Sequence, residues 1–235
     1  MSKNQFLPFF PHREGINIII TLFIISFLLI WLGHKILSCV LAIFGVFCCY
    51  FFRNPDKVSP VGKNYILSPA DGTIQDISLS DAPKHFAEYF PEKMLKVSIF
   101  LSVFNVHVNR VPVDGKIEKI VYSPGKFFNA SLDKASYDNE KNAVLITSSC
   151  GHKIVFCQIA GFVARRIVCD LEKDQNVLAG QRFGIIKFGS RVDIYLPKEL
   201  KVLVGKGQIV SGGETVISKF NFSDENEKIV FSSRE

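Results

Sequence analysis

Two long apolar runs stand near the start of the chain, and a short polar turn separates them. Residues 16–32 and 36–52 are almost wholly apolar, with Gly33, His34 and Lys35 between them. Each run has about 17 residues, close to the shortest helix that crosses a hydrocarbon core of roughly 30 Å. The pattern predicts a membrane-anchoring helical hairpin over residues 1–52. A buried helical pair in a soluble core is the alternative.

Basic residues are placed unevenly around this predicted hairpin. The turn carries Lys35 alone, whereas the flanks carry Lys3, Arg13, Arg53 and Lys57. Positively charged flanks tend to stay on the cytoplasmic side of a membrane. We therefore expect both ends of the hairpin, and the rest of the chain, on the cytoplasmic side of a bacterial-type inner membrane.

After residue 52 the pattern changes to short segments of alternating apolar positions, separated by Gly, Pro and Asn. Such segments predict β-strands. The predicted strands are residues 72–77, 95–102, 107–111, 115–122, 143–148, 153–159, 184–188, 192–195 and 216–219, with a further candidate at 162–168. Residues 82–92 predict a helix or a helical loop. The pattern therefore predicts one mostly-β (α+β) domain over residues 53–235.

A sequence echo divides this domain into two related parts. The pattern D-G-x-I-x-x-I occurs at residues 71–77 and again at 114–120. Residues 177–181 and 209–214 also resemble each other, as units of a turn followed by a strand. Turns of this kind resemble those of lipoyl and biotinyl carrier domains. We expect a β-barrel or sandwich of two lipoyl-like halves.

One candidate function is therefore a membrane-tethered, lipoyl-like carrier or scaffold domain without catalysis. A carrier needs a lysine at the tip of a hairpin, where it can be modified. The nearest match is Asp133-Lys134-Ala135, which lies in a polar loop without hairpin flanks. The sequence disfavours a carrier for this reason.

Charge and cysteine content exclude further classes. The formal net charge of +6 is spread along the chain without a basic run or interleaved aromatic patch, so nucleic acid is not an expected partner. A modest, distributed positive charge suits an anionic membrane surface instead. The six cysteines form no C-x-x-C pair, and the histidines do not lie at zinc-ligand spacing from them, so we expect no metal site.

The strand-like runs GIIKF and RVDIYLP are interrupted by Gly189-Ser190. A glycine leaves its carbonyl carbon sterically open, so the adjacent hydroxyl of Ser190 can attack the peptide bond that precedes it. The plainer interpretation is a β-bulge or bend in an antiparallel pair. A serine hydrolase is a weaker alternative, because the sequence around Ser190 lacks G-x-S-x-G.

Breaking this peptide bond needs a base, and His107 is the best candidate. Period-two alternation in FNVHVNR would put Asn105, His107 and Asn109 on one face, as in the wall of a site. An orienting carboxylate would fix the imidazole tautomer. The residues alone do not choose among three candidates, since an aspartate before glycine is usually a turn residue. These are Asp71, its repeat twin Asp114, and Asp193.

Taken together, the ordered motifs resemble a known family, the short form of the phosphatidylserine decarboxylase proenzymes. The resemblance runs from about residue 53 to residue 218. It is carried, in this order, by ILSPADGTI, SIFLSVFNVHVNRVPVDGKI, FNASLDKASYDNEKN, QIAGFVARRI, VLAGQRFGIIKFGSRVDIYLP and GQIVSGGETVIS. Each motif is weak alone, but the ordered set is specific, and the N-terminal apolar pair fits the same family.

The resemblance implies a pyruvoyl-dependent enzyme that decarboxylates phosphatidylserine in the membrane to phosphatidylethanolamine and CO2. Autocatalytic cleavage between Gly189 and Ser190 would give a β chain, 1–189, and an α chain, 190–235, which together form a heterodimer. Ser190 would become the covalent pyruvoyl group, the cofactor that acts as electron sink. The family's triad maps onto Asp71, His107 and Ser190, so the resemblance, and not the physics, selects Asp71.

Three positions depart from the pattern expected of the family. Longer members often have a second histidine where this chain has Phe104, so no role of that histidine carries over. The cleavage motif is FGSR where the long form has LGST, which fits the short form. Lys141 stands where an arginine is expected, so a role of that loop in substrate binding does not carry over either.

Overall fold

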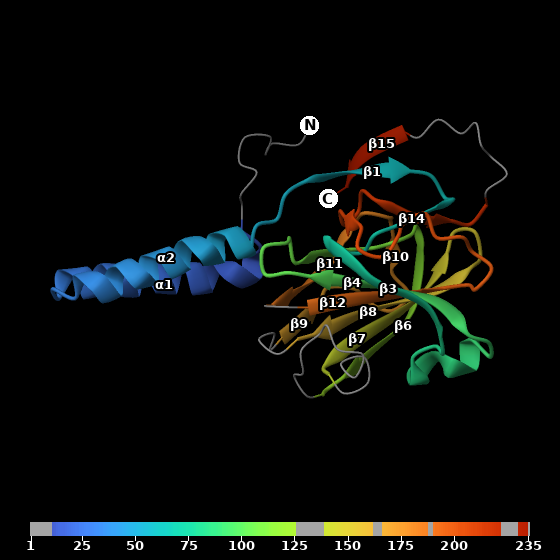
Figure 1. The fold of residues 1–235 in the computed structure, drawn as a ribbon, viewed down its shortest axis with the longest axis horizontal. Helices are drawn as coiled ribbons and strands as arrows, with labels where there is room; N and C mark the ends of the chain where they lie inside the picture. The colour runs from blue at the N-terminus through green and yellow to red at the C-terminus, as the bar shows by residue number, and fades with distance from the viewer. Residues whose placement is uncertain (1–10, 126–138, 162–165, 188–189, 222–229, 235) are drawn as a thin grey trace. The chain divides into compact units, whose positions relative to one another are not determined.

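The computed structural model describes residues 11–125, 139–161, 166–187, 190–221 and 230–234. The chain forms two compact units, Met1–Asp56 and Lys57–Glu235. The first is helical and the second is built mainly of β-strands (Figure 1). This confirms the predicted fold class of a mostly-β domain preceded by an N-terminal helical hairpin.

The first unit consists of α1 (Arg13–Trp31) and α2 (Lys35–Phe51). By length and composition α1 can cross a membrane, whereas α2 is a shorter apolar helix of 17 residues. Most of the large apolar side chains on both helices are exposed. The alternative of a helical pair buried in a soluble core therefore finds no support in the described part of the chain.

Two serines join the helices near their turn. Ser26 Oγ donates to the carbonyl of Ser38 at 2.8 Å, and Ser38 Oγ donates to the carbonyl of Ser26 at 2.6 Å. At the open end of the hairpin, Gly15 lets the two segments approach closely, since a Cβ there would lie 2.3 Å from Phe52 Cγ. Small residues and reciprocal side-chain hydrogen bonds are the means by which helices associate in lipid, where hydrophobic attraction between them is lost.

The second unit contains four antiparallel sheets among its described residues. The largest has eight strands in the order β10 (Asn176–Val177), β6 (Gly115–Ser123), β7 (Lys141–Ser148), β8 (Lys153–Ala160), β12 (Ser190–Leu196), β4 (Met94–Leu101), β3 (Gly72–Ser80) and β13 (Ile209–Val210). A second sheet has the order β5 (Val108–Arg110), β11 (Arg182–Lys187) and β9 (Arg166–Cys169). The two remaining pairs are β1 (Lys57–Val61) with β15 (Val230–Arg234), and β14 (Val216–Lys219) with β2 (Tyr65–Leu67).

Both faces of the eight-stranded sheet carry buried apolar clusters. The main core lies on the face toward β11 and includes Val192 and Ile194 of β12, together with Phe156 and Phe183, whose rings meet edge to face. The other face carries a second apolar cluster, in which Phe86 of the short 3-10 helix η1 (Lys84–Tyr89) is fully buried. Because β12 lies between β4 and β8 and is covered on both sides, it is among the best-fixed parts of the fold (Figure 1).

The eight-stranded sheet consists of two related halves that meet between β8 and β12. In one half β3 pairs with β4 and β13, and in the other β6 pairs with β7 and β10. Each D-G-x-I strand is bulged at the same place, between Ile74 and Asp76 in β3 and between Ile117 and Lys119 in β6. The echo in the sequence therefore reflects a repeated structural unit.

Two glycine positions recur in both halves for steric reasons. A Cβ on Gly72 would lie 2.3 Å from the carbonyl oxygen of a neighbouring strand, and one on Gly115 would lie 2.2 Å from its equivalent. Gly180 and Gly213, in the turns after β10 and β13, have φ angles of 82° and 75°, which side chains rarely adopt. These requirements explain why the two halves share their glycines.

Several sequence expectations about local structure need correction. The segments 177–181 and 209–214 are strands followed by turns, not turns followed by strands. The strand expected at 107–111 is shorter, Val108–Arg110. The helical stretch is confined to the six residues of η1 between Pro83 and Pro91. The candidate strand at 162–168 corresponds to β9 only from residue 166, because 162–165 lie outside the described residues.

Candidate active site

Ser190 is the first residue of β12, in the middle of the eight-stranded sheet. It pairs with Leu101 of β4 and Ala160 of β8, so strands on both sides fix its backbone. Its side chain is fully buried, and its Oγ has no hydrogen-bond partner among the described residues. An unpaired buried hydroxyl costs about 1–3 kcal/mol and calls for a functional explanation.

Gly189 and Phe188 lie outside the described residues, and a strand is present on either side as expected, although β12 already begins at Ser190 and not at residue 192. β11 belongs to the three-stranded sheet, where it pairs with β5 and β9, whereas β12 pairs with β4 and β8. The interpretation of Gly189-Ser190 as a bulge in one antiparallel pair is therefore wrong. Between Lys187 and Ser190 the chain therefore passes from the three-stranded to the eight-stranded sheet.

His107 is fully buried, immediately before β5. Its Nδ1 lies 2.9 Å from the carbonyl oxygen of Asn105. Because a carbonyl oxygen can only accept, Nδ1 carries the proton in this contact, and Nε2 carries the lone pair of the neutral ring. Asn105 itself lies in a turn, where its side chain accepts from the amide and hydroxyl of Ser102, so it does not share a strand face with His107 as predicted.

Hydrogen bonds bring the His107 segment to the face of the sheet that carries Ser190. Asn109 Oδ1 accepts from Gln158 Nε2 at 2.9 Å, and Gln158 lies directly opposite Val192 in the sheet. Directly opposed side chains share a face, and alternate residues of one strand point the same way. The side chains of Gln158, Val192 and Ser190 are therefore on one face, and this face is the one that the His107 segment covers.

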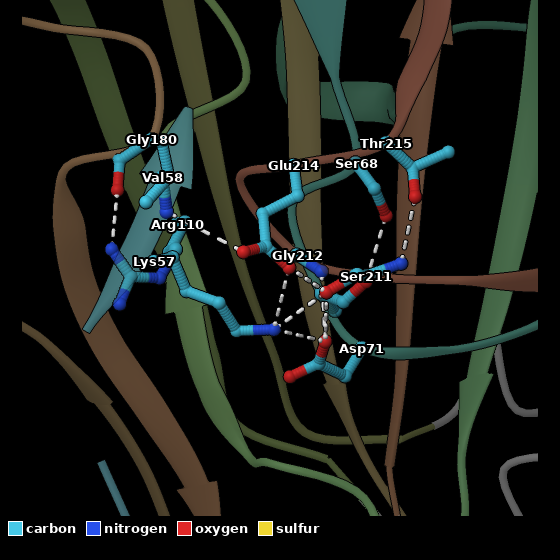
Figure 2. A network of polar contacts seen from close by, with 11 residues as sticks. Lys57, Val58, Ser68, Asp71, Arg110, Gly180, Ser211, Gly212, Glu214 and Thr215 are labelled. Atoms are coloured by element: carbon cyan, nitrogen blue, oxygen red, sulfur yellow. Dashed lines mark hydrogen bonds and ion pairs between the residues drawn. The ribbon is translucent and has the colours of Figure 1, made fainter. Parts of the chain in front are cut away.

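Asp71 lies just before β3, and one of its carboxylate oxygens is the centre of a polar cluster (Figure 2). Oδ1 accepts from Lys57 Nζ at 2.9 Å, from the Gly212 amide at 2.9 Å and from Ser211 Oγ at 3.1 Å. Figure 2 shows the second carboxylate oxygen turned away from Ser211 and Gly212. Among the described residues, no hydrogen bond joins Asp71 to His107.

Strand register shows that Asp71 and its repeat twin Asp114 lie at different ends of the eight-stranded sheet. β12 begins beside the end of β4, which pairs with the start of β3, so Asp71 lies at the same end of the sheet as Ser190. The two are about two strand spacings apart, roughly 10 Å. β6 instead begins beside the end of β7 and the start of β8, whereas Ser190 pairs with the last residue of β8. Asp114 therefore lies at the opposite end.

Asp193, the third candidate carboxylate, forms a buried ion pair with Arg191. Arg191 Nε lies 2.9 Å from Asp193 Oδ1, and Nη2 donates to Oδ2 at 3.1 Å. Burial raises the pKa of Asp193, against the guanidinium of Arg191 and the hydroxyl of Ser98, which act to lower it. Because these residues alternate with Ser190 along β12, the pair lies on the opposite face of the sheet and not beside Ser190.

The polar groups that surround Asp71 were not predicted from the sequence. Besides its contact with Asp71, Lys57 Nζ lies 3.2 Å from Glu214 Oε2, and Ser211 Oγ donates to the same oxygen at 2.5 Å. Partial burial acts to raise the pKa of Glu214, but the hydrogen bond from Ser211 and the ammonium of Lys57 outweigh it and hold this pKa below its ordinary value. The cluster thus contains two carboxylates and one ammonium.

A signal for part of this cluster was present in the sequence echo. Ser211 and Glu214 occupy the turn positions that Leu178 and Gln181 occupy in the other half. A comparison of the two turns therefore identifies the half with added polar groups. Nothing comparable could reveal Lys57, which is separated from Ser211 by 154 positions.

Two other expectations concern binding sites. Asp133-Lys134-Ala135 lies outside the described residues. Within the described ranges, no group of three or more His, Cys, Asp or Glu side chains is arranged to hold a metal ion.

Comparison with known proteins agrees with the family suggested by the ordered motifs. Residues 44–218 match the family model of phosphatidylserine decarboxylase. The chain is 53% identical over 209 residues to the phosphatidylserine decarboxylase proenzyme of Rickettsia typhi, which covers 89% of this chain and 90% of the relative. It is 54% identical, with the same coverage, to the proenzyme of Rickettsia bellii. The chain belongs to the phosphatidylserine decarboxylase family and is an enzyme of that class.

Proposed function

We propose that the chain cleaves itself between Gly189 and Ser190, and that the cleaved form decarboxylates phosphatidylserine to phosphatidylethanolamine and CO2. The observation that carries this proposal is the Ser190 hydroxyl, which is buried, held at the start of a central strand and without a partner among the described residues. The relatives are named proenzymes, which agrees with a maturation step.

Maturation begins when Ser190 Oγ attacks the carbonyl carbon of Gly189 and its proton passes to His107. The acyl group moves from nitrogen to oxygen, which leaves an ester at Oγ. A base then removes the α-proton of residue 190, the Cβ–Oγ bond breaks, and Gly189 leaves as a carboxylate. Hydrolysis of the resulting dehydroalanine consumes one water, releases ammonia and leaves a pyruvoyl group at the start of residues 190–235.

His107 suits the role of base because its ring is already oriented. The contact of Nδ1 with the Asn105 carbonyl favours the tautomer in which Nε2 accepts a proton. When Nε2 takes the serine proton, the ring becomes an imidazolium, which a nearby carboxylate stabilises. Asp71 supplies that negative charge from the same end of the sheet, through space and not through a direct hydrogen bond.

The described residues also fit a pyruvoyl group at position 190. Its precursor hydroxyl has no described partner that would have to be displaced, and Leu101 and Ala160 hold the backbone on both sides. Once formed, such a group supplies the electron sink for loss of CO2. His107 is the residue that would hold the proton that replaces the lost carboxylate in the product.

Two features of the chain concern where the enzyme works. Residues 1–52 would anchor the catalytic domain, residues 53–235, at the cytoplasmic face of the membrane that contains the substrate. After cleavage, β12 to β15 of residues 190–235 would remain paired with β1, β2, β3, β4 and β8 of residues 1–189, as a heterodimer. Deleting residues 1–52 should release the domain from membranes, and persistent tight membrane binding would contradict the anchor.

Intact-mass analysis of the purified full chain tests the cleavage directly. The wild type should yield two fragments, 1–189 and a residue 190–235 fragment without a free amino-terminal serine. Ser190→Ala should remain one chain and lack activity on phosphatidylserine vesicles. Recovery of only a full-length, active wild-type chain would refute the proposed maturation.

The repeat twins provide a matched pair of variants for the site. Asp71→Asn should abolish or strongly slow cleavage, whereas Asp114→Asn, the same change at the equivalent turn, should leave it near the wild-type rate. His107→Ala should block cleavage. Normal processing of His107→Ala would remove this residue as the base, and equal effects of the two aspartate variants would remove the special role of Asp71.

A further inference from the structure

Lys57 occupies a special place in the polar cluster around Asp71. It is the first residue of β1, and its side chain is mostly buried, with 12% of its surface exposed. Its ammonium lies 2.9 Å from Asp71 Oδ1, 3.2 Å from Glu214 Oε2 and 2.5 Å from Ser211 Oγ (Figure 2). All three hydrogens of the ammonium can therefore be used within the cluster.

The other half of the sheet shows which of these contacts the fold requires. Asp114 Oδ1 accepts from the Ala179 amide at 2.7 Å, as Asp71 Oδ1 accepts from the Gly212 amide. No ion pair to Asp114 occurs within the described ranges of the chain. A backbone amide is thus sufficient for an aspartate in this turn, and the added ammonium at Asp71 needs another explanation.

Building on the proposed self-cleavage, we propose that Lys57 is a positioning residue that fixes the Asp71 carboxylate in place for maturation. Glu214 opposes this effect of Lys57, because its carboxylate attracts the same ammonium and adds a second negative charge to the cluster. The hydroxyl of Ser211 has one proton and faces both carboxylates, at 3.1 Å from Asp71 and 2.5 Å from Glu214. The balance between Lys57 and Glu214 therefore sets the charge next to Asp71.

This arrangement predicts opposite effects for the two charged neighbours. Removal of the ammonium takes away one of the three donors to Asp71 Oδ1, so cleavage should be slower than in the wild type. Removal of the Glu214 charge leaves the ammonium to Asp71 alone, so cleavage should proceed at the wild-type rate or faster. The neighbouring Arg110 guanidinium, which donates to the Gly180 carbonyl at 2.7 Å, is the same in every variant (Figure 2).

The experiment follows self-cleavage of the full chain as a function of pH. Precursor made by cell-free synthesis with phospholipid vesicles in the cold is transferred to buffers from about pH 4 to about pH 9, which spans carboxylate and imidazole titration. The rate of appearance of the 190–235 fragment is then measured on gels. Lys57→Met should slow cleavage about tenfold or more across this range, because Asp71 Oδ1 loses its hydrogen bond from a charged group.

Two further variants keep the test decisive if Lys57→Met does not fold. Lys57→Arg preserves the charged donor and should restore the wild-type rate, and Glu214→Gln should cleave at or above the wild-type rate. An exposed ion pair supplies the controls, Lys116→Met and Asp174→Asn, which should match the wild type throughout.

The outcomes separate this inference from the proposed function. Cleavage of the wild type together with an unslowed Lys57→Met variant, or with a slowed Glu214→Gln variant, would overturn the inference alone. Equal slowing of both variants at every pH would mean that the cluster is merely structural, and would overturn it too. A wild type that does not cleave at any pH would refute the proposed function, and this inference with it.

Discussion

Breaking the buried Arg191–Asp193 pair should strongly destabilise the catalytic domain. The two side chains are only 2% and 0% exposed. Asp193→Asn keeps the shape of the side chain but removes the charge beside a buried guanidinium. Removal of one partner from such a pair costs about 3–5 kcal/mol, because the remaining charge has lost its hydration without compensation. The exposed Lys116–Asp174 pair, with side chains 53% and 62% exposed, is screened by solvent and contributes little, so Asp174→Asn is the matched control.

The measurement is urea unfolding followed by circular dichroism in detergent, in a Ser190→Ala background that keeps the chain in one piece. With a slope of about 2 kcal/mol per molar urea, a loss of 3–5 kcal/mol lowers the midpoint by about 1.5–2.5 M. Asp174→Asn should move it by less than about 0.5 M. A similarly small shift for Asp193→Asn would refute the reasoning.

A double variant separates charge from packing at this site. Replacement of a buried ion pair by apolar residues of similar volume is often neutral or stabilising. Arg191→Met combined with Asp193→Leu should therefore recover most of the stability lost in Asp193→Asn. If the double variant is as unstable as Asp193→Asn, the loss of stability comes from the changed shape of the side chains and not from the unpaired charge.

Three further predictions concern the rest of the chain. Gly115→Ala should cost about 3 kcal/mol in urea unfolding, the upper end for overpacking, because its Cβ would lie 2.2 Å from the Thr147 carbonyl oxygen, which is backbone and cannot turn aside. Ser26→Ala with Ser38→Ala should loosen the hairpin by about 1–2 kcal/mol, seen as faster hydrogen exchange of the helix amides in micelles. Because the pKa of Glu214 is lowered, its contribution to stability is present above about pH 4.3 and is lost as the pH falls through the folded value, so the stability difference between wild type and Glu214→Gln should narrow on acidification.

The long-range architecture was predictable wherever the chain repeats a strong local pattern. The two apolar runs predicted both helices, and alternating apolar positions predicted most strands of the eight-stranded sheet. The strands β10 and β13 escaped detection because two residues are too few to show a period. β1 was missed because Pro60 interrupts it, although at an edge paired only with β15 a proline is tolerated.

The candidate site was less accessible to sequence reasoning, for a different physical reason. Ser190 could be found because its chemistry depends on the residue next to it. The surroundings of Asp71 depend on Ser211 and Gly212, which are 140 and 141 positions away and are brought close only by strand pairing. The twin turns could distinguish Ser211 from Leu178, but only register shows that Asp71, and not Asp114, shares an end of the sheet with Ser190.

The asymmetry between the two halves also bears on the cleaved enzyme. Lys57 and Asp71 belong to residues 1–189, whereas Ser211 and Glu214 belong to residues 190–235, so the cluster joins the two proposed chains. β1, which carries Lys57, pairs with β15 from the other side of the cut. If cleavage occurs as proposed, the contacts that hold Asp71 during maturation also hold it afterwards, because no peptide bond within the cluster is broken. Separation of the chains would then remove two of the three donors to Asp71 Oδ1, and a mature enzyme forced apart should lose its site together with its strand pairing.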